Sequence, residues 1–134
     1  MSRVVPDGFE LVKLDNGFGD HFGPVYRKEV NSRYVFAFRV SPHQLNIAGM
    51  RHGGAIATFA DIQIAAIKPF TDLAGKHLPT RNLNMDYIAP VPAEAWVEME
   101  VDFVRITRGS VYMHSQITAN GKVAARSSAT YHIP

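Results

Sequence analysis

The sequence predicts an α+β fold in which a curved antiparallel sheet wraps around one central, buried helix. The first observation is a single apolar, alanine-rich run at residues 55–67, which has the composition of a helix. The second is a series of later segments in which apolar and polar residues alternate, as they do in strands with one buried face. The third is that no second helical pattern follows residue 70. A sheet of this kind and one apolar helix cover each other's apolar surface when the sheet curls around the helix.

Composition supports one globular domain covering residues 1–134. Hydrophobic residues make up 46% of the chain and charged residues 19%, which is ordinary for a globular protein. The net charge is only +2 and Lys and Arg form no dense cluster, so nucleic-acid binding has no support. The chain has no cysteine, which excludes disulfides and cysteine-ligated zinc. No export signal is apparent and the apolar run is too short to span a bilayer, so we expect a cytoplasmic protein without a membrane partner.

The first half of the chain is predicted to lead into the helix. Glycines and prolines interrupt residues 1–30, where we expect a short helix or turn, a loop and the start of an edge strand. Residues 34–40 alternate with aromatic side chains on one side, which indicates a strand. Residues 43–51 form a loop, the helix follows, and Lys68-Pro69 ends it.

Four strands are predicted in the second half, at residues 80–88, 95–106, 111–119 and 123–133. In the second of these the apolar positions run on odd numbers to Phe103 and change to even numbers at Val104, which predicts a β-bulge and a bend. Asn120-Gly121 is a strong signal for a two-residue hairpin turn. The two edges of such a sheet stay open, and pairing with a second copy of the chain would cover them.

Two unusual features lie on the predicted helix. His52-Gly53-Gly54 stands at its start, and Asp61 interrupts its apolar interior. A buried carboxylate is costly unless it is hydrogen-bonded, paired or used in chemistry. Each feature has a structural explanation by itself, since Asp61 can bond a neighbouring loop and His52 can cap the helix. Their presence on one helix favours a functional site.

These residues resemble a known family. The run Asn46-x-x-Gly49-x-x-His52-Gly53-Gly54, Asp61 and the closing Ser-Ala-Thr-Tyr-His-Ile resemble the hotdog-fold acyl-CoA thioesterases, and among them the subgroup that includes the phenylacetate-degradation thioesterases. The resemblance covers nearly the whole chain. It implies a hotdog fold and a homodimer, often a dimer of dimers and so a homotetramer. It also implies hydrolysis of a small aryl- or acyl-CoA thioester to free acid and CoA, without a cofactor.

The resemblance also implies roles for individual residues. Asp61 matches the catalytic carboxylate, and the Gly53 backbone N–H matches the group that polarises the thioester carbonyl. Asn46 matches a residue that orients substrate or water, and Thr80 falls where some relatives have a Ser or Thr that holds the water. Alternation places Thr80 on the polar side of its strand, so it reaches the site only if the backbone kinks there. Ile62-Gln63-Ile64 is bulkier than the small residues that many relatives have after the Asp, which would reshape the acyl pocket.

The chemistry can also be argued from the residues. Hydrolysis needs a donor for the developing oxyanion, and the free N–H groups at a helix N-terminus suit this task. Gly53 and Gly54 let a substrate carbonyl approach the backbone closely. A desolvated Asp61 could act as a general base on water or attack directly to give a mixed anhydride. The sequence leaves both routes open.

Spacing restricts how these groups combine. Gly53 and Asp61 are eight residues apart, which is roughly 12 Å along a helix axis. Catalytic contacts need heavy atoms within about 3 Å, so one carbonyl cannot touch both. Either one of the two is not catalytic, or the site joins Gly53 of one chain to Asp61 of another. We favour the second explanation, in which two antiparallel helices form two equal sites and dimerisation is required for activity.

Other candidates are weaker. His52 could be a base, although ordering the loop or capping the helix suits it better. The six histidines match no metal motif, so no metal is expected. The sequence contains no Gly-x-Ser-x-Gly elbow, which argues against a serine hydrolase. Basic side chains, Arg81 and Arg108 among them, are candidates for binding the CoA phosphates. A hotdog enoyl-thioester hydratase and a non-catalytic acyl-thioester binder remain alternatives, and a thiol-release assay over several acyl-CoAs separates all three.

Overall fold

The computed structural model describes residues 4–13 and 17–134, which form one sheet with helices on its concave side. In chain order the elements are β1 (Glu10–Val12), α1 (Phe18–Phe22), β2 (Val25–Glu29), β3 (Tyr34–Arg39), η1 (Pro42–Gln44), α2 (Gly53–Ala60), η2 (Asp61–Ala66), η3 (Lys68–Phe70), β4 (Thr80–Tyr87), β5 (Trp96–Ile106), β6 (Ser110–Ala119) and β7 (Lys122–His132). The η elements are 3₁₀ helices.

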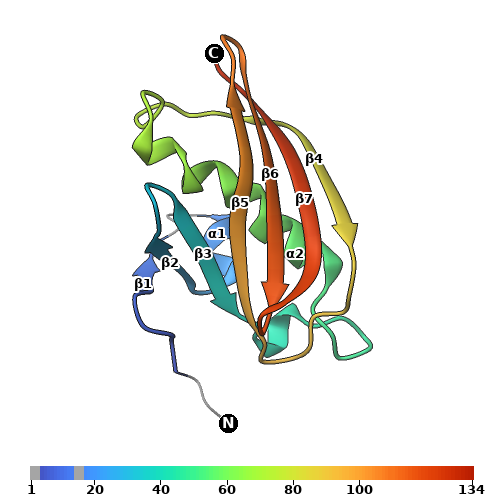
Figure 1. The fold of residues 1–134 in the computed structure, drawn as a ribbon. Helices are drawn as coiled ribbons and strands as arrows, with labels where there is room; N and C mark the ends of the chain where they lie inside the picture. The colour runs from blue at the N-terminus through green and yellow to red at the C-terminus, as the bar shows by residue number, and fades with distance from the viewer. Residues whose placement is uncertain (1–3, 14–16) are drawn as a thin grey trace.

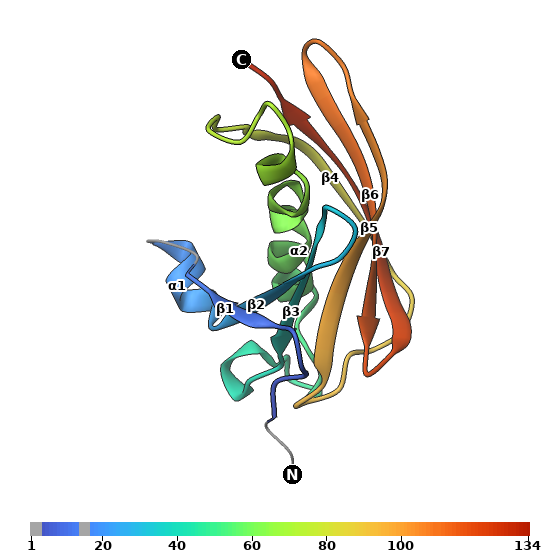
Figure 2. The same cartoon turned by 60° about the vertical axis from the view of Figure 1, so that its left-hand side comes forward.

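The sheet wraps around α2 as the sequence predicts. Its seven strands follow the order β1-β2-β3-β5-β6-β7-β4, and every neighbouring pair is antiparallel. Figures 1 and 2 show the long strands β5, β6 and β7 curving past α2, while α1 lies on the other side of α2 from them. The strand order places β4 at one edge, so one side of β4 has no strand beside it among the described residues. No helix in the described part of the chain is long and apolar enough to span a bilayer.

The central helix is shorter as an α-helix than the apolar run predicts. Regular α-helix spans Gly53–Ala60, and the chain continues as 3₁₀ helix over Asp61–Ala66. The side chain of Gln63 explains why this stretch is held against the sheet. Its amide nitrogen donates to Ala60 O (3.0 Å) and to Ser127 Oγ (3.1 Å), and its amide oxygen accepts from Ser115 Oγ (2.7 Å). Asp61 therefore lies at the junction of the two helix types rather than in the middle of one helix.

Strand β5 carries the predicted bulge, but Phe103 lies on the opposite face of the sheet from the one expected. The pairing with β6 shifts between Val101 and Phe103, so Val101 and Val104 face inward while Phe103 faces outward. The sequence placed Phe103 in the inner row, which is wrong, because the extra residue is Asp102. The hairpin at Asn120-Gly121 is confirmed, with φ of 50° and 85° at its two residues.

The N-terminal region differs in part from the expectation. The short helix α1 and the strand β2 are present, but residues 10–12 form the extra strand β1 rather than a helix or turn. The core lies between the sheet and α2. Its fully buried larger side chains include Phe38, Ile56, Phe59, Met99, Met113, Ile117 and Tyr131.

Candidate active site

The loop before α2 is closed by Asn46. Its Oδ1 accepts hydrogen bonds from the backbone N–H groups of Ala48 (2.9 Å) and Met50 (3.1 Å), and its own N–H donates to Met50 O (2.6 Å). Gly49 in this loop has a φ of +79°, a conformation that favours glycine. The amide oxygen of Asn46 thus shapes the loop that leads into the helix, a task beyond the substrate-orienting role that the resemblance implied.

His52 caps the N-terminus of α2. Its Nδ1 accepts a hydrogen bond from the Gly54 N–H at 2.9 Å, which satisfies one of the donors that a helix start leaves open. A nitrogen that accepts cannot carry a proton, so this bond fixes the tautomer with the proton on Nε2. The N–H of Gly54, a residue that the sequence predicts to lie close to the substrate, therefore already has an acceptor within the protein.

Gly53 keeps its N–H available. Among the described residues nothing accepts a hydrogen bond from this N–H, while the Gly53 carbonyl accepts one from Tyr87 Oη (2.6 Å). A Cβ at this position would lie 3.3 Å from the Tyr87 ring, so the close approach of β4 favours glycine here. Gly53 and Tyr87 also line a pocket of about 360 Å³ beside Asn46 and Met50. The N-terminus of α2 thus carries one unpaired N–H on a residue that lines a cavity.

Asp61 lies where α2 ends, with two hydroxyl groups on one of its carboxylate oxygens. Thr80 Oγ1 donates to Asp61 Oδ1 at 2.8 Å, and Tyr131 Oη lies 3.3 Å from the same atom. The pairing of β4 with β7 shifts between Thr80 and Asn82, which is the backbone kink that Thr80 needs to face the helix. The structure therefore brings Thr80 and Asp61 together within one chain.

Tyr131 is the residue of this cluster that sequence reasoning missed. Its hydroxyl also donates to the Asp61 backbone oxygen at 2.8 Å, so a single residue contacts both the main chain and the side chain of Asp61. Burial, the charge of Asp61 and the hydrogen bond to it raise the pKa of the Tyr131 phenol well above its usual value. The available signal was a tyrosine in a buried strand row, because a buried phenol needs a hydrogen-bond partner.

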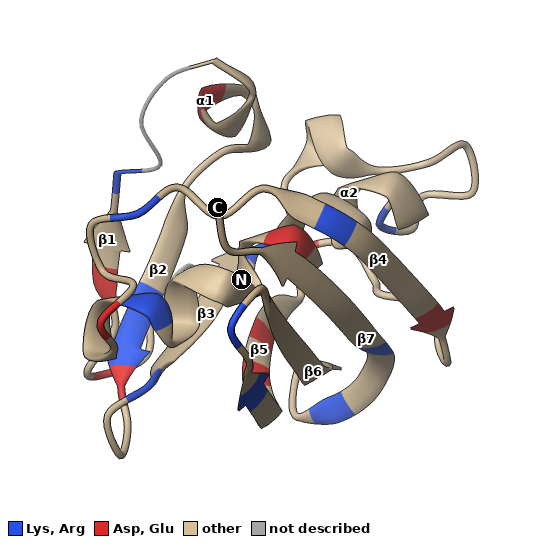
Figure 3. Ribbon diagram, turned by 90° about the horizontal axis from the view of Figure 1, so that it is seen from above, with Lys and Arg blue, Asp and Glu red and all other residues tan. Residues whose placement is uncertain are grey.

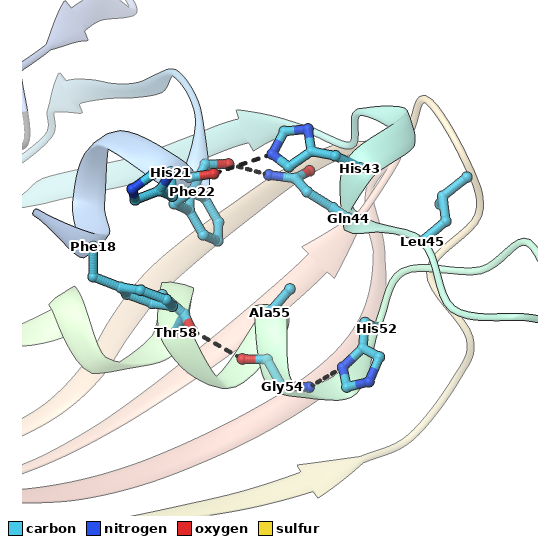
Figure 4. Close-up of a pocket in the computed structure, with 10 residues that line it drawn as sticks. All are labelled: Phe18, His21, Phe22, His43, Gln44, Leu45, His52, Gly54, Ala55 and Thr58. Atoms are coloured by element: carbon cyan, nitrogen blue, oxygen red, sulfur yellow. Dashed lines mark hydrogen bonds between the residues drawn. The ribbon is translucent and has the colours of Figure 1, made fainter.

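Two cavities follow α2 from its start to Asp61. The first, of about 430 Å³, lies between α1 and the start of α2 and is drawn in Figure 4, where Phe18 extends toward Thr58. The second, of about 210 Å³, contains Asp61 and is otherwise lined mainly by Phe18, Phe22, Phe59 and other apolar groups. Both are lined by Phe18, Phe22 and Thr58, so they adjoin each other. The carboxylate of Asp61 thus borders an apolar cavity.

The two arginines proposed for phosphate binding differ in their surroundings. Arg81 already donates to Ser110 Oγ (3.0 Å) and contacts His132 Nδ1 at 2.7 Å. Arg108 is exposed in the turn between β5 and β6. Both lie at the end of the sheet where β4 begins, the end away from Gly53; Figure 3 marks the basic residue near the start of β4 in blue.

The predicted site residues thus form two groups. Asn46, His52, Gly53 and Gly54 gather at the start of α2, and Asp61 and Thr80 meet at its end. Because α2 is regular from Gly53 to Ala60, the separation of Gly53 from Asp61 stays at roughly 12 Å along the axis. Within one chain, no single carbonyl touches both.

Comparison with known proteins gives relatives of this architecture. The chain is 22% identical to a putative esterase, PA0474, of Pseudomonas aeruginosa over 131 residues, which are 97% of this chain and 98% of that protein. It is 29% identical to the acyl-coenzyme A thioesterase THEM4 of Rattus norvegicus over 117 residues, or 87% of this chain and 49% of that protein. The chain therefore spans about half the length of THEM4.

A solved structure supports the fold. A mutant of the phenylacetic acid degradation protein PaaI from Thermus thermophilus superposes with a TM-score of 0.74 at 24% identity, covering 87% of this chain and 98% of that one. The hotdog fold, and its likeness to proteins of phenylacetate degradation, are confirmed at this level. The family model of the thioesterase superfamily matches residues 48–132, which include Gly53, Asp61 and Thr80. The expectation of a thioester hydrolase is thereby confirmed: this chain belongs to the thioesterase superfamily.

Proposed function

We propose that this protein is an acyl-CoA thioesterase whose two active sites each combine Gly53 of one protomer with Asp61 of its partner. The observation that carries the proposal is the arrangement on α2. An unpaired N–H stands at one end, and a carboxylate held by Thr80 and Tyr131 stands at the other, too distant for one thioester. Two such helices packed antiparallel about a two-fold axis bring unlike ends together twice.

The edge strand β4 supports a dimer of this kind. In the described part of the chain β4 pairs with β7 on one side only, and its surface is mostly exposed. Open strand edges tend to pair with another chain, and β4 also carries Thr80 and Tyr87, which contact the two ends of α2. A contact between the two β4 edges would place both helices next to the two-fold axis. A dimer of dimers is compatible with the proposal and is not required by it.

The reaction assigns one task to each group. The partner's Gly53 N–H, at the positive end of its helix, donates to the thioester oxygen as negative charge develops there. The Asp61 carboxylate either takes a proton from an attacking water or attacks the carbonyl carbon itself, and CoA leaves as the thiol in both routes. The apolar cavity beside Asp61 would take a small acyl or aryl group. Arg108, exposed near the start of β4, is available for the CoA phosphates, as Arg81 is if it exchanges its present partners.

Thiol release with mixed dimers tests the proposal. We expect Asp61→Asn alone to lower the rate about 10²–10⁴-fold, since the general base or nucleophile is lost. Gly53→Pro removes the N–H at the first position of the helix and should be similarly inactive. Because its Cβ would lie 3.3 Å from the Tyr87 ring, circular dichroism must show that the variant keeps its fold. A purified heterodimer of the two variants would contain one intact Gly53–Asp61 site and recover about half of wild-type activity.

The same experiment has a clear contrary outcome. If both groups acted within one chain, every site of the heterodimer would be defective and no activity would return. The acyl-CoA panel separates the other activities: hydration of a crotonyl thioester without thiol release would indicate a hydratase, and binding without either product would indicate a carrier.

A further inference from the structure

We propose that Tyr131 is a positioning residue for the reaction: with Thr80 it holds Oδ1 of Asp61, so that Oδ2 is the oxygen that acts on water or on the thioester. The inference rests on the proposed role of Asp61 and adds to it which carboxylate oxygen reacts and what fixes it.

The contacts are unequal for the two oxygens. Oδ1 accepts from Thr80 Oγ1 at 2.8 Å and lies 3.3 Å from Tyr131 Oη, whereas no described residue donates a hydrogen bond to Oδ2. The two hydroxyls come from β4 and β7, which are paired strands with Thr80 directly opposite Tyr131. A carboxylate held through one oxygen by two rigid strands has little freedom to rotate, so its other oxygen keeps a defined direction.

Tyr131 also fixes the backbone that carries the carboxylate. Its hydroxyl donates to Asp61 O at 2.8 Å. In a continuous α-helix the Asp61 carbonyl would accept from residue 65. In the 3₁₀ helix that begins at Asp61 the donor within the helix is residue 64, and Tyr131 adds a second donor from the sheet. The single phenol proton is thus shared between the backbone oxygen of Asp61 at 2.8 Å and the carboxylate at 3.3 Å, so Tyr131 contacts both the main chain and the side chain of Asp61 at the helix junction.

The phenol remains a donor under working conditions. Tyr131 is 1% exposed, and burial together with the negative charge of Asp61 raises the pKa of its hydroxyl far above neutral pH. Neutral hydroxyls are the groups that contact the carboxylate: among the described residues Asp61 forms no ion pair, and the other residues lining its cavity are uncharged. The direction of the carboxylate is therefore set by hydrogen bonds, which removal of a single oxygen atom can change.

Tyr131→Phe tests this with the ring retained. We expect kcat to fall about tenfold or more with little change in KM, because the phenol touches Asp61 and not the substrate. Thr80→Val should also lower kcat with little change in KM, because it removes the other hydroxyl that contacts Oδ1.

Tyr112→Phe is the matched control. Tyr112 is an exposed tyrosine on the adjacent strand β6, and its hydroxyl has no partner among the described residues. We expect the kcat and KM of Tyr112→Phe to match those of the wild type. A Tyr131→Phe protein that is less stable to heat but keeps the wild-type kcat and KM would overturn the inference, since the hydroxyl of Tyr131 would then be purely structural.

The failure of this inference is distinguishable from failure of the proposed function. If Asp61→Asn abolishes thiol release while Tyr131→Phe behaves as wild type, the thioesterase assignment stands and the positioning role is wrong. If Asp61→Asn keeps its activity, the proposed function itself is wrong.

Discussion

The side chain of Arg51 is buried, although its position in a loop suggests an exposed charge. It is only 4% exposed, and its guanidinium lies over the rings of Phe38 (4.6 Å) and Phe22 (5.0 Å). One nitrogen makes a long contact of 3.4 Å with Gln44 O, and Nε and Nη2 have no partner among the described residues. Burial lowers the pKa of this group to about 10, so it is still charged at neutral pH. The flat guanidinium fills the space between two rings and carries a desolvated charge there.

Replacing Arg51 by Met should therefore stabilise the fold. Methionine keeps much of the length and the contact with both rings, and it removes a buried charge without a counter-ion. We expect the free energy of unfolding in urea to rise by about 1 kcal/mol. Arg126→Met, on an exposed arginine of β7, is the control and should change stability by less than about 0.5 kcal/mol. A clear loss of stability in Arg51→Met would mean that ring stacking and the Gln44 contact outweigh the desolvation of the charge.

Among the elements, α2 depends on the cap at its first turn. His52 Nδ1 accepts a hydrogen bond from the Gly54 N–H. The N–H of Gly53, a residue that lines a cavity, has no acceptor among the described residues. A frayed first turn would misplace this N–H. The capping role and the role of a catalytic base make different predictions for an amide side chain.

His52→Asn separates the two roles. Asparagine is a good N-cap, so this variant should keep nearly wild-type stability and most of its thiol release. His52→Ala lacks a cap and should lose about 1 kcal/mol of stability in a denaturant titration, with a lower kcat. An inactive but fully stable His52→Asn protein would show instead that the imidazole is a catalytic base.

The sequence predicts elements well where one apolar pattern decides them. Alternation found β3, β4, β6 and β7, and the dipeptide Asn120-Gly121 found a hairpin, because each signal is local. The end of α2 at Ala60 was missed because it depends on Gln63 reaching two serines on strands more than 50 residues away. The bulge was found but Phe103 was placed on the wrong face, since periodicity alone does not say which residue is extra.

For the molecule as a whole, the sequence predicts those residues of the candidate site that are unusual for the secondary structure around them. Asp61 in an apolar run and paired glycines at a helix start are conspicuous in the sequence. Thr80 was expected to reach Asp61 only if the backbone kinked, and the structure has a register shift at that position. Tyr131 follows the ordinary pattern of a buried strand residue, so its contact with Asp61 depends on tertiary structure. Arg81 likewise resembles a free surface charge until Ser110 and His132 are seen beside it.

The proposed site exists only between protomers, and this gives a prediction for the whole protein. Specific activity should fall on dilution in step with the fraction of monomer, because a lone chain holds Gly53 and Asp61 roughly 12 Å apart. Thiol release and sedimentation velocity measured over the same concentration series should give one common midpoint. Circular dichroism at the lowest concentration serves as the control, since a monomer that has unfolded would also be inactive. Folded monomers that turn over at the full rate would place the whole reaction within one chain and remove the reason for a shared site.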